Sequence, residues 1–134
     1  MTMHVHNITV DATDALGLAT FWSRLLGWHV FHDDDPEVVV APHFPYAGTG
    51  MLFIPVPEGK TAKNRLHVDV APDDETRDEA VARAEGLGAR VLADHRRDDG
   101  TGWVVMADPE GNEFCVERGP HEKGPLPPQT WRLG

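Results

Sequence analysis

The stretch Ala107-Asp108-Pro109-Glu110-Gly111-Asn112-Glu113-Phe114-Cys115-Val116-Glu117 joins a turn to a strand. Its Asp-Pro-Glu-Gly segment has an acceptor side chain first, a proline with preset φ second and a glycine last, which is the composition of a tight turn. Because strand side chains alternate between two faces, Glu113, Cys115 and Glu117 share one face and Phe114 lies on the other. The apolar face is predicted to pack in the hydrophobic core. The face with a thiol between two carboxylates predicts a ligand pocket.

Length and charge limit what this chain can be. Its 134 residues suit one domain with a hydrophobic core and are too few for two ordinary domains. The net charge of −10 argues against nucleic-acid or anionic-membrane partners and is compatible with a cationic ligand. A single cysteine excludes an internal disulfide. No apolar run approaches the roughly 20 residues that span a bilayer, and the N-terminus lacks secretory-signal features, so we expect a cytoplasmic protein.

The first half of the chain predicts a strand, a helix and three further strands. The strand covers residues 5–10, and Asp11-Ala12-Thr13-Asp14 supplies N-cap chemistry for the helix. The helix carries apolar residues at i, i+3, i+4, i+7 and i+8 and ends at Gly27; these residues are Leu18, Phe21, Trp22, Leu25 and Leu26. The three strands are predicted at residues 28–31, 37–41 and 51–56.

The second half repeats this order of elements. A strand is predicted at residues 66–70, and the acidic segment 73–75 is expected to open a helix with a narrower apolar stripe. Strands are predicted near residues 90–93, 102–107 and 113–117. Each half is therefore β-α-β-β-β, and we expect Phe53 and Phe114, one in each half, to be core residues.

An offset of 61 residues aligns the two halves on helix ends, turns and strand centres. It pairs His6 with His67 and Ile54 with Cys115. These four positions lie on the first and last predicted strands of each half. If the halves curl toward one another, their side chains converge.

Three segments resemble the vicinal oxygen chelate superfamily, in particular its glyoxalase-like and bleomycin-resistance-like members. They are the helix and its end at residues 19–28, Leu66-His67-Val68-Asp69, and the turn and strand at residues 108–114. The resemblance implies an α+β fold in which two tandem β-α-β-β-β modules form a curved mixed sheet around a small cavity. The domain would cover residues 1–118, with modules at about 4–57 and 65–118, and leave a proline-rich tail at 119–134. Members of this kind often form homodimers, which we expect here.

The resemblance also implies a metal site. In metal-dependent glyoxalases of this fold, the four converging positions usually carry two histidines or glutamines and two glutamates. His6 and His67 match this pattern, whereas Ile54 and Cys115 depart from it. Isoleucine cannot bind a metal, and a thiolate in place of a carboxylate favours zinc, iron or nickel over magnesium or calcium. We therefore expect either a divalent metal on His6, His67 and Cys115 or no metal at all.

Other candidate residues surround these positions. Neither departing position supplies a carboxylate, and Glu113, Glu117 and Asp69 lie one strand period away as candidate replacements; Glu113 and Glu117 are the candidate general bases. The pocket candidates are Ile54, Asp69 and Trp103. The simpler alternative is that His6 and His67 face a polar cavity and Cys115 is a buried small apolar residue. The basic run at residues 60–65 is usually a solvated connection; its functional alternative is an entrance that attracts an anionic substrate.

Two functions follow from the resemblance. The first is a glyoxalase-like enzyme, an isomerase or lyase that acts on a small molecule with two adjacent oxygens. Glyoxalase I activity itself is not expected, because two of the four usual ligands differ. The alternative is a metal-free protein that binds a bleomycin-type antibiotic or a metabolite without catalysis. The charge of −10 suits a cationic drug.

Overall fold

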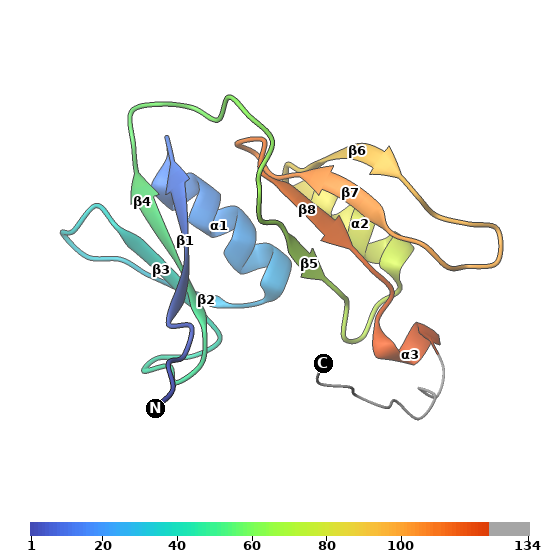
Figure 1. Cartoon of the computed structure of the whole chain (residues 1–134), viewed down its shortest axis with the longest axis horizontal. Helices are drawn as coiled ribbons and strands as arrows, with labels where there is room; N and C mark the ends of the chain where they lie inside the picture. The colour runs from blue at the N-terminus through green and yellow to red at the C-terminus, as the bar shows by residue number, and fades with distance from the viewer. Residues whose placement is uncertain (124–134) are drawn as a thin grey trace.

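The computed structural model describes residues 1–123 as two β-α-β-β-β modules (Figure 1). The first comprises β1 (Asn7–Ala12), α1 (Ala15–Leu26), β2 (His29–Phe31), β3 (Val38–Ala41) and β4 (Gly50–Pro55). The second comprises β5 (Val68–Val70), α2 (Arg77–Leu87), β6 (Arg90–Asp94), β7 (Val104–Ala107) and β8 (Glu113–Val116), followed by α3 (Pro120–Lys123). The predicted α+β fold and its element order are confirmed.

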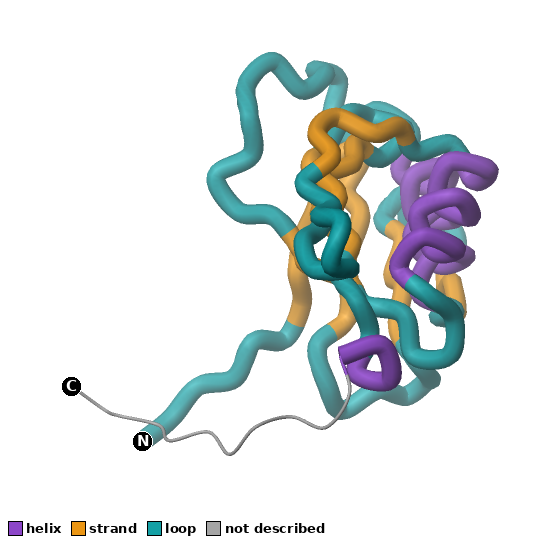
Figure 2. The backbone as a smooth tube through the Cα atoms, turned by 90° about the vertical axis from the view of Figure 1, so that its right-hand side faces the viewer, coloured by secondary structure: helices purple, strands orange, loops and turns teal. Residues whose placement is uncertain are grey.

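Each module forms its own four-stranded mixed sheet. The strand orders are β1-β4-β3-β2 and β5-β8-β7-β6, with β1 parallel to β4 and β5 parallel to β8. The remaining neighbours are antiparallel. Figure 1 shows the sheets side by side, with α1 behind the first and α2 behind the second. Seen from the side in Figure 2, the two helices lie together. Strands β1 and β5 are sheet edges that border the joint between the modules.

Helix α1 begins and ends where its sequence predicts. The Asp14 carboxylate accepts a hydrogen bond from the Gly17 N–H at 3.0 Å, which satisfies one of the free donors of the first turn. Gly27 closes the helix in the left-handed conformation with φ of 69°. The predicted apolar stripe is buried, apart from the half-buried Leu26.

Helix α2 begins later than the acidic segment predicted. Its N-cap is Thr76, whose hydroxyl accepts from the Glu79 N–H at 3.1 Å while the Glu79 carboxylate accepts from the Thr76 N–H at 3.0 Å. This reciprocal arrangement satisfies two backbone donors. The acidic residues 73–75, which precede Thr76, make no such pair of hydrogen bonds within residues 1–123. The expectation for residues 73–75 was therefore wrong by one to three positions.

One hydrophobic core runs through both modules. Phe53 and Phe114 are both fully buried, which confirms their predicted role. The Phe114 ring contacts two rings of α1 edge-on, at 5.1 Å from Trp22 and 6.1 Å from Phe21 between centroids. Helix α1 of the first module therefore packs directly on β8 of the second.

The turn at residues 108–111 ties the modules together. Its Asp108 carboxylate is buried and accepts from the Trp22 Nε1–H of α1 at 3.0 Å. The same carboxylate accepts the backbone N–H groups of Glu110 and Asn112 and the Asn112 amide. Gly111 has φ of 89°, a conformation that side chains disfavour. The turn is thus fixed from within and anchored to the first module.

Glu110 makes the second link between the modules. Its carboxylate accepts from the Thr13 N–H at 2.7 Å, the Thr13 hydroxyl at 3.0 Å and the Asp14 N–H at 3.0 Å, just before α1 begins. We expect Glu110→Gln to lower the free energy of unfolding by about 1–2 kcal/mol, since an amide cannot accept all three. Urea titration would measure this. Glu85→Gln on the exposed surface of α2 is the matched control, and an equal loss in both variants would contradict the assignment.

The C-terminal tail begins with a short helix that was not expected. Prolines such as those in residues 119–134 disfavour the interior of a helix, yet α3 starts at Pro120, because proline is tolerated in the first helical turn. The rest of the predicted tail, residues 124–134, lies outside the described residues. Among residues 1–123, no helix has both the length and the hydrophobicity to cross a membrane.

Candidate functional site

The polar face of β8 forms one side of the candidate site. Phe114 and Val116 are buried in the core, so Glu113 and Cys115 point to the opposite face of the second sheet. Strand β5 lies beside β8, and Asp69 is the register partner of Cys115. The neighbouring strands therefore bring a carboxylate and a thiol together.

Three side chains on this face form a group that could hold a metal ion. The donor atoms of His67, Asp69 and Cys115 all lie within 4.8 Å of one another. His67 Nε2 and Asp69 Oδ1 are 3.4 Å apart. A tetrahedral zinc ion holds its ligand atoms about 3.5 Å apart, so the group would contract slightly around it. One nitrogen, one oxygen and one sulfur donor suit zinc or iron, and three protein ligands leave a position for a substrate.

The surroundings of Cys115 favour the protonated form of its thiol. Burial raises the pKa of its thiol to about 11, and the negative charges of Asp69 and Glu117 add to this effect. The thiol therefore stays protonated at neutral pH unless a cation displaces its proton. A divalent ion at this position reverses the local electrostatics, because it stabilises the thiolate directly.

His6 is not part of this group. Its ring is exposed in the first module and stacks on Tyr46 at 5.7 Å between centroids. The reason lies in the register of the two sheets. Phe53 and Phe114 are 61 residues apart, but their strand partners Val10 and Val68 are only 58 apart. The structural counterpart of His67 is therefore Thr9, three residues beyond His6.

The predicted pocket residues Ile54 and Trp103 lie apart from each other. Ile54 is half-buried in the first sheet, where its register partner is Asp11. Trp103 lies just before β7, with its ring 4.8 Å from the His95 ring and 5.6 Å from the Arg97 guanidinium carbon. Asp69, the third predicted pocket residue, is in the metal-capable group. In the first module, Asp11 and Ile54 are at the positions that correspond to Asp69 and Cys115. Because isoleucine cannot bind a metal, the first module has no equivalent group.

The two candidate general bases, Glu113 and Glu117, differ in the hydrogen bonds of their carboxylates. The Glu113 carboxylate accepts from Lys60 Nζ at 3.0 Å and from the Asn64 N–H at 3.1 Å, and it thereby fastens the linker between β4 and β5. Burial raises the pKa of Glu113, but these hydrogen bonds and the Lys60 charge outweigh it, so the pKa lies below its ordinary value. Glu117 donates its backbone N–H to Val70, and its carboxylate makes no hydrogen bond within residues 1–123. Glu117 is therefore the freer proton acceptor.

The stability that the Lys60–Glu113 contact contributes depends on pH. Because the Glu113 pKa is lowered by folding, its contribution to stability is present above the ordinary value of 4.5 and is lost as the pH falls through the folded value. We expect Glu113→Gln to be less stable than the wild type at pH 7, with the difference shrinking below about pH 4.5. Urea titrations between pH 3 and pH 7 would measure this. A difference that stays constant over that range would contradict the role of the charge.

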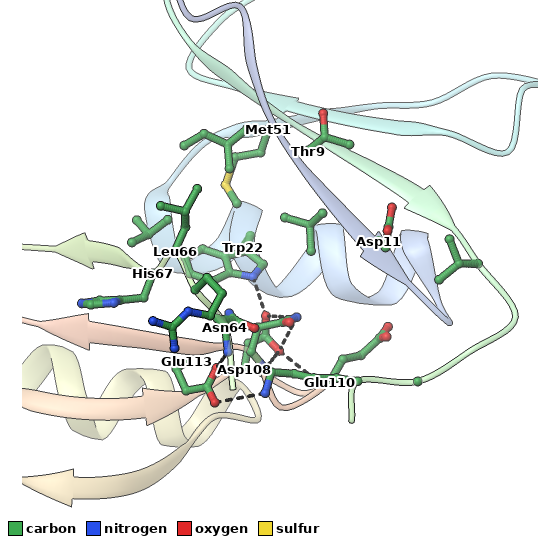
Figure 3. A pocket seen from close by; sticks show the side chains of 18 of the residues that line it. Thr9, Asp11, Trp22, Met51, Asn64, Leu66, His67, Asp108, Glu110 and Glu113 are labelled. Atoms are coloured by element: carbon green, nitrogen blue, oxygen red, sulfur yellow. Dashed lines mark hydrogen bonds and ion pairs between the residues drawn. The ribbon is translucent and has the colours of Figure 1, made fainter. Parts of the chain in front are cut away.

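A cavity of about 730 Å³ adjoins the group at the joint between the modules. Its apolar lining comes from β1, α1, β4, the linker between β4 and β5, and the start of β5, namely Ile8, Val10, Trp22, Met51, Val56, Leu66 and Val68. Figure 3 shows the His67 imidazole pointing away from Trp22 and Met51. His67 therefore lines the cavity, while its imidazole is part of the metal-capable group.

Sequence reasoning missed two features of this site. Asp69 was assigned to the pocket without a ligand role, although its place two residues after His67 on a strand put both on one face. Asp108 was recognised only as a turn residue. Its bond to Trp22 joins residues 86 positions apart, and no local pattern announces such a contact.

Comparisons with known proteins agree with this architecture. A family model described as "Glyoxalase-like domain" matches residues 7–117. No curated protein sequence matches the chain. A glyoxalase/bleomycin resistance/dioxygenase family enzyme from Burkholderia phytofirmans has a similar structure, with 14% identity, a TM-score of 0.67 and coverage of 87% of this chain and 98% of that one.

Two further solved structures carry names that specify an activity or a ligand. Lactoylglutathione lyase from Agrobacterium tumefaciens has 20% identity and a TM-score of 0.59, covering 89% of this chain and 96% of that one. A mutant of the fosfomycin resistance protein FosX from Listeria monocytogenes, complexed with Mn(II) and 1S,2S-dihydroxypropylphosphonic acid, has 16% identity and a TM-score of 0.66, covering 87% and 90%. At these identities the likeness shows the fold alone.

Proposed function

Because the chain belongs to the glyoxalase-like domain family of the vicinal oxygen chelate superfamily, we propose that it is a metal-dependent enzyme acting on a small molecule with two adjacent oxygens. The reaction class is isomerisation or elimination. The observation that carries this proposal is the group of nitrogen, oxygen and sulfur donors within 4.8 Å of one another, beside a cavity of about 730 Å³. The Mn(II) complex of the FosX neighbour supports a metal in this fold.

The proposed ligands are His67, Asp69 and Cys115, and zinc or iron suits them best. The bound ion would supply Lewis acidity toward substrate oxygens. His67 and Asp69 are about half exposed at their side chains, 49% and 52%, so a substrate can reach the site from solvent. Cys115 is buried and holds the ion from the sheet side.

The chain's own residues supply the remaining functions. The apolar walls of the cavity, including Trp22 and Met51, hold the carbon body of the substrate and exclude water from it. Glu117 lies on the same face as Cys115 and is our choice for the proton acceptor, because Glu113 is already engaged by Lys60 and Asn64. This assignment makes Glu113 a residue that positions the linker.

Metal content of the purified protein tests the proposal. After dialysis against zinc and removal of excess metal, we expect about one zinc per chain in the wild type and in His6→Ala, and a large loss in His67→Ala. Both histidines are exposed, so His6→Ala is a matched control for the loss of an imidazole. A wild type without zinc would overturn the metalloenzyme proposal and favour the metal-free binding function. Loss of zinc in His6→Ala as well would instead place the site at the joint between the modules.

A further inference from the structure

The linker between β4 and β5 concentrates positive charge in an acidic protein. Lys60, Lys63 and Arg65 lie within six residues, in a chain with 12 basic and 22 acidic residues. Lys60 is neutralised by Glu113 at 3.0 Å. Lys63 and Arg65 are exposed and form no hydrogen bond or ion pair with any residue in the described range 1–123. Two unpaired cations therefore remain on this segment.

These cations lie beside both parts of the candidate site. The Asn64 N–H donates to Glu113 at 3.1 Å, which fixes the linker over β8 two residues from Cys115. Lys63 directly precedes Asn64, and its positive charge acts on Cys115, where it opposes the raised pKa. Arg65 lines the cavity. The linker thus places Lys63 next to the Asn64–Glu113 contact on β8 and Arg65 in the cavity wall.

Most acidic groups around the cavity do not compete for these cations. The carboxylates of Asp108 and Glu110 accept hydrogen bonds from the turn and from the start of α1. Asp11 also lines the cavity, and its side chain points away from Trp22 in Figure 3. Of the two remaining acidic lining residues, Glu113 already pairs with Lys60, and Glu58 is exposed and lies seven positions before Arg65. A negatively charged ligand group is therefore the best complement to Lys63 and Arg65.

We propose that the ligand is an amphipathic organic oxyanion, with its apolar body in the cavity and its carboxylate, phosphonate or phosphate group held by Lys63 and Arg65. The apolar lining by Ile8, Met51 and Leu66 accounts for the first part and the unpaired cations for the second. This inference rests on the proposed function, because the same ligand would present its oxygens to the metal.

Isothermal titration with phenylphosphonate and with the neutral benzyl alcohol tests the inference. We expect the zinc-dialysed wild type to bind phenylphosphonate more tightly, with an affinity that falls as salt rises. The double variant Lys63→Gln/Arg65→Gln should bind phenylphosphonate about tenfold or more weakly and leave benzyl alcohol binding unchanged. The control is Arg90→Gln together with Arg24→Gln, which removes two exposed cations elsewhere on the chain.

The outcomes separate this inference from the proposed function. Equal phenylphosphonate affinity in the double variant and the wild type would overturn the inference, as would no binding to the wild type. Zinc content, measured on the same samples, should stay at the wild-type level in the double variant. If neither the wild type nor the double variant binds zinc, and the double variant binds phenylphosphonate more weakly than the wild type, the anion site is supported and the metal-dependent function is rejected.

Discussion

Replacement of Asp108 by alanine is expected to lower the free energy of unfolding by about 3–5 kcal/mol. The side chain is only 3% exposed, and its carboxylate accepts hydrogen bonds from Trp22, Glu110 and Asn112. Alanine would leave these donors without their partner and remove the link between α1 and the turn before β8. Because this link joins the modules, the variant should unfold at a much lower temperature.

Thermal unfolding followed by circular dichroism would measure the effect, as a fall in Tm of roughly 10–20 °C for a domain of this size. Asp94→Ala is the matched control, because Asp94 is an exposed aspartate whose partner Arg96 is also at the surface. We expect little change there. A similar small change in Asp108→Ala would show that the turn does not hold the modules together.

Much of the fold could be predicted because its signals are local. The apolar stripe of α1, an N-cap within residues 11–14 and the Gly27 C-cap act within one helix, and each was confirmed. The start of α2 was misplaced because several acidic residues precede Thr76 and compete for the N-cap in sequence terms. Only the reciprocal bonds between Thr76 and Glu79 decide between them.

The arrangement of the site depends on strand register, which the repeat did not reveal. An offset of 61 holds for β4 and β8, but β1 and β5 are offset by 58. A shift of three residues also exchanges the two faces of a strand. This is why His6 was paired with His67 from the sequence, whereas the structure groups His67 with Asp69 and Cys115. Single-sequence reasoning has no access to that register.

Cys115→Ala is expected to weaken zinc binding by about 100-fold or more, because changes that only reposition a ligand already cost 10–100-fold. The sulfur is the buried donor of the proposed site, and its loss leaves only two exposed ligands. Competition with a chromophoric chelator would measure the affinity. Ile54→Ala, at the corresponding position of the first module, is the control that should keep wild-type affinity. Unchanged affinity in Cys115→Ala would exclude the thiol from the site.

The absorption spectrum of the protein after addition of Co(II) would show whether the Cys115 thiolate binds a metal ion. A thiolate bound to cobalt gives an intense near-ultraviolet charge-transfer band, which carboxylate and imidazole ligands do not give. We expect this band in the wild type, with one equivalent of cobalt per chain, and its absence in Cys115→Ser, which keeps the size of the side chain. No band in the wild type, or the same band in both proteins, would contradict a metal site built from His67, Asp69 and Cys115.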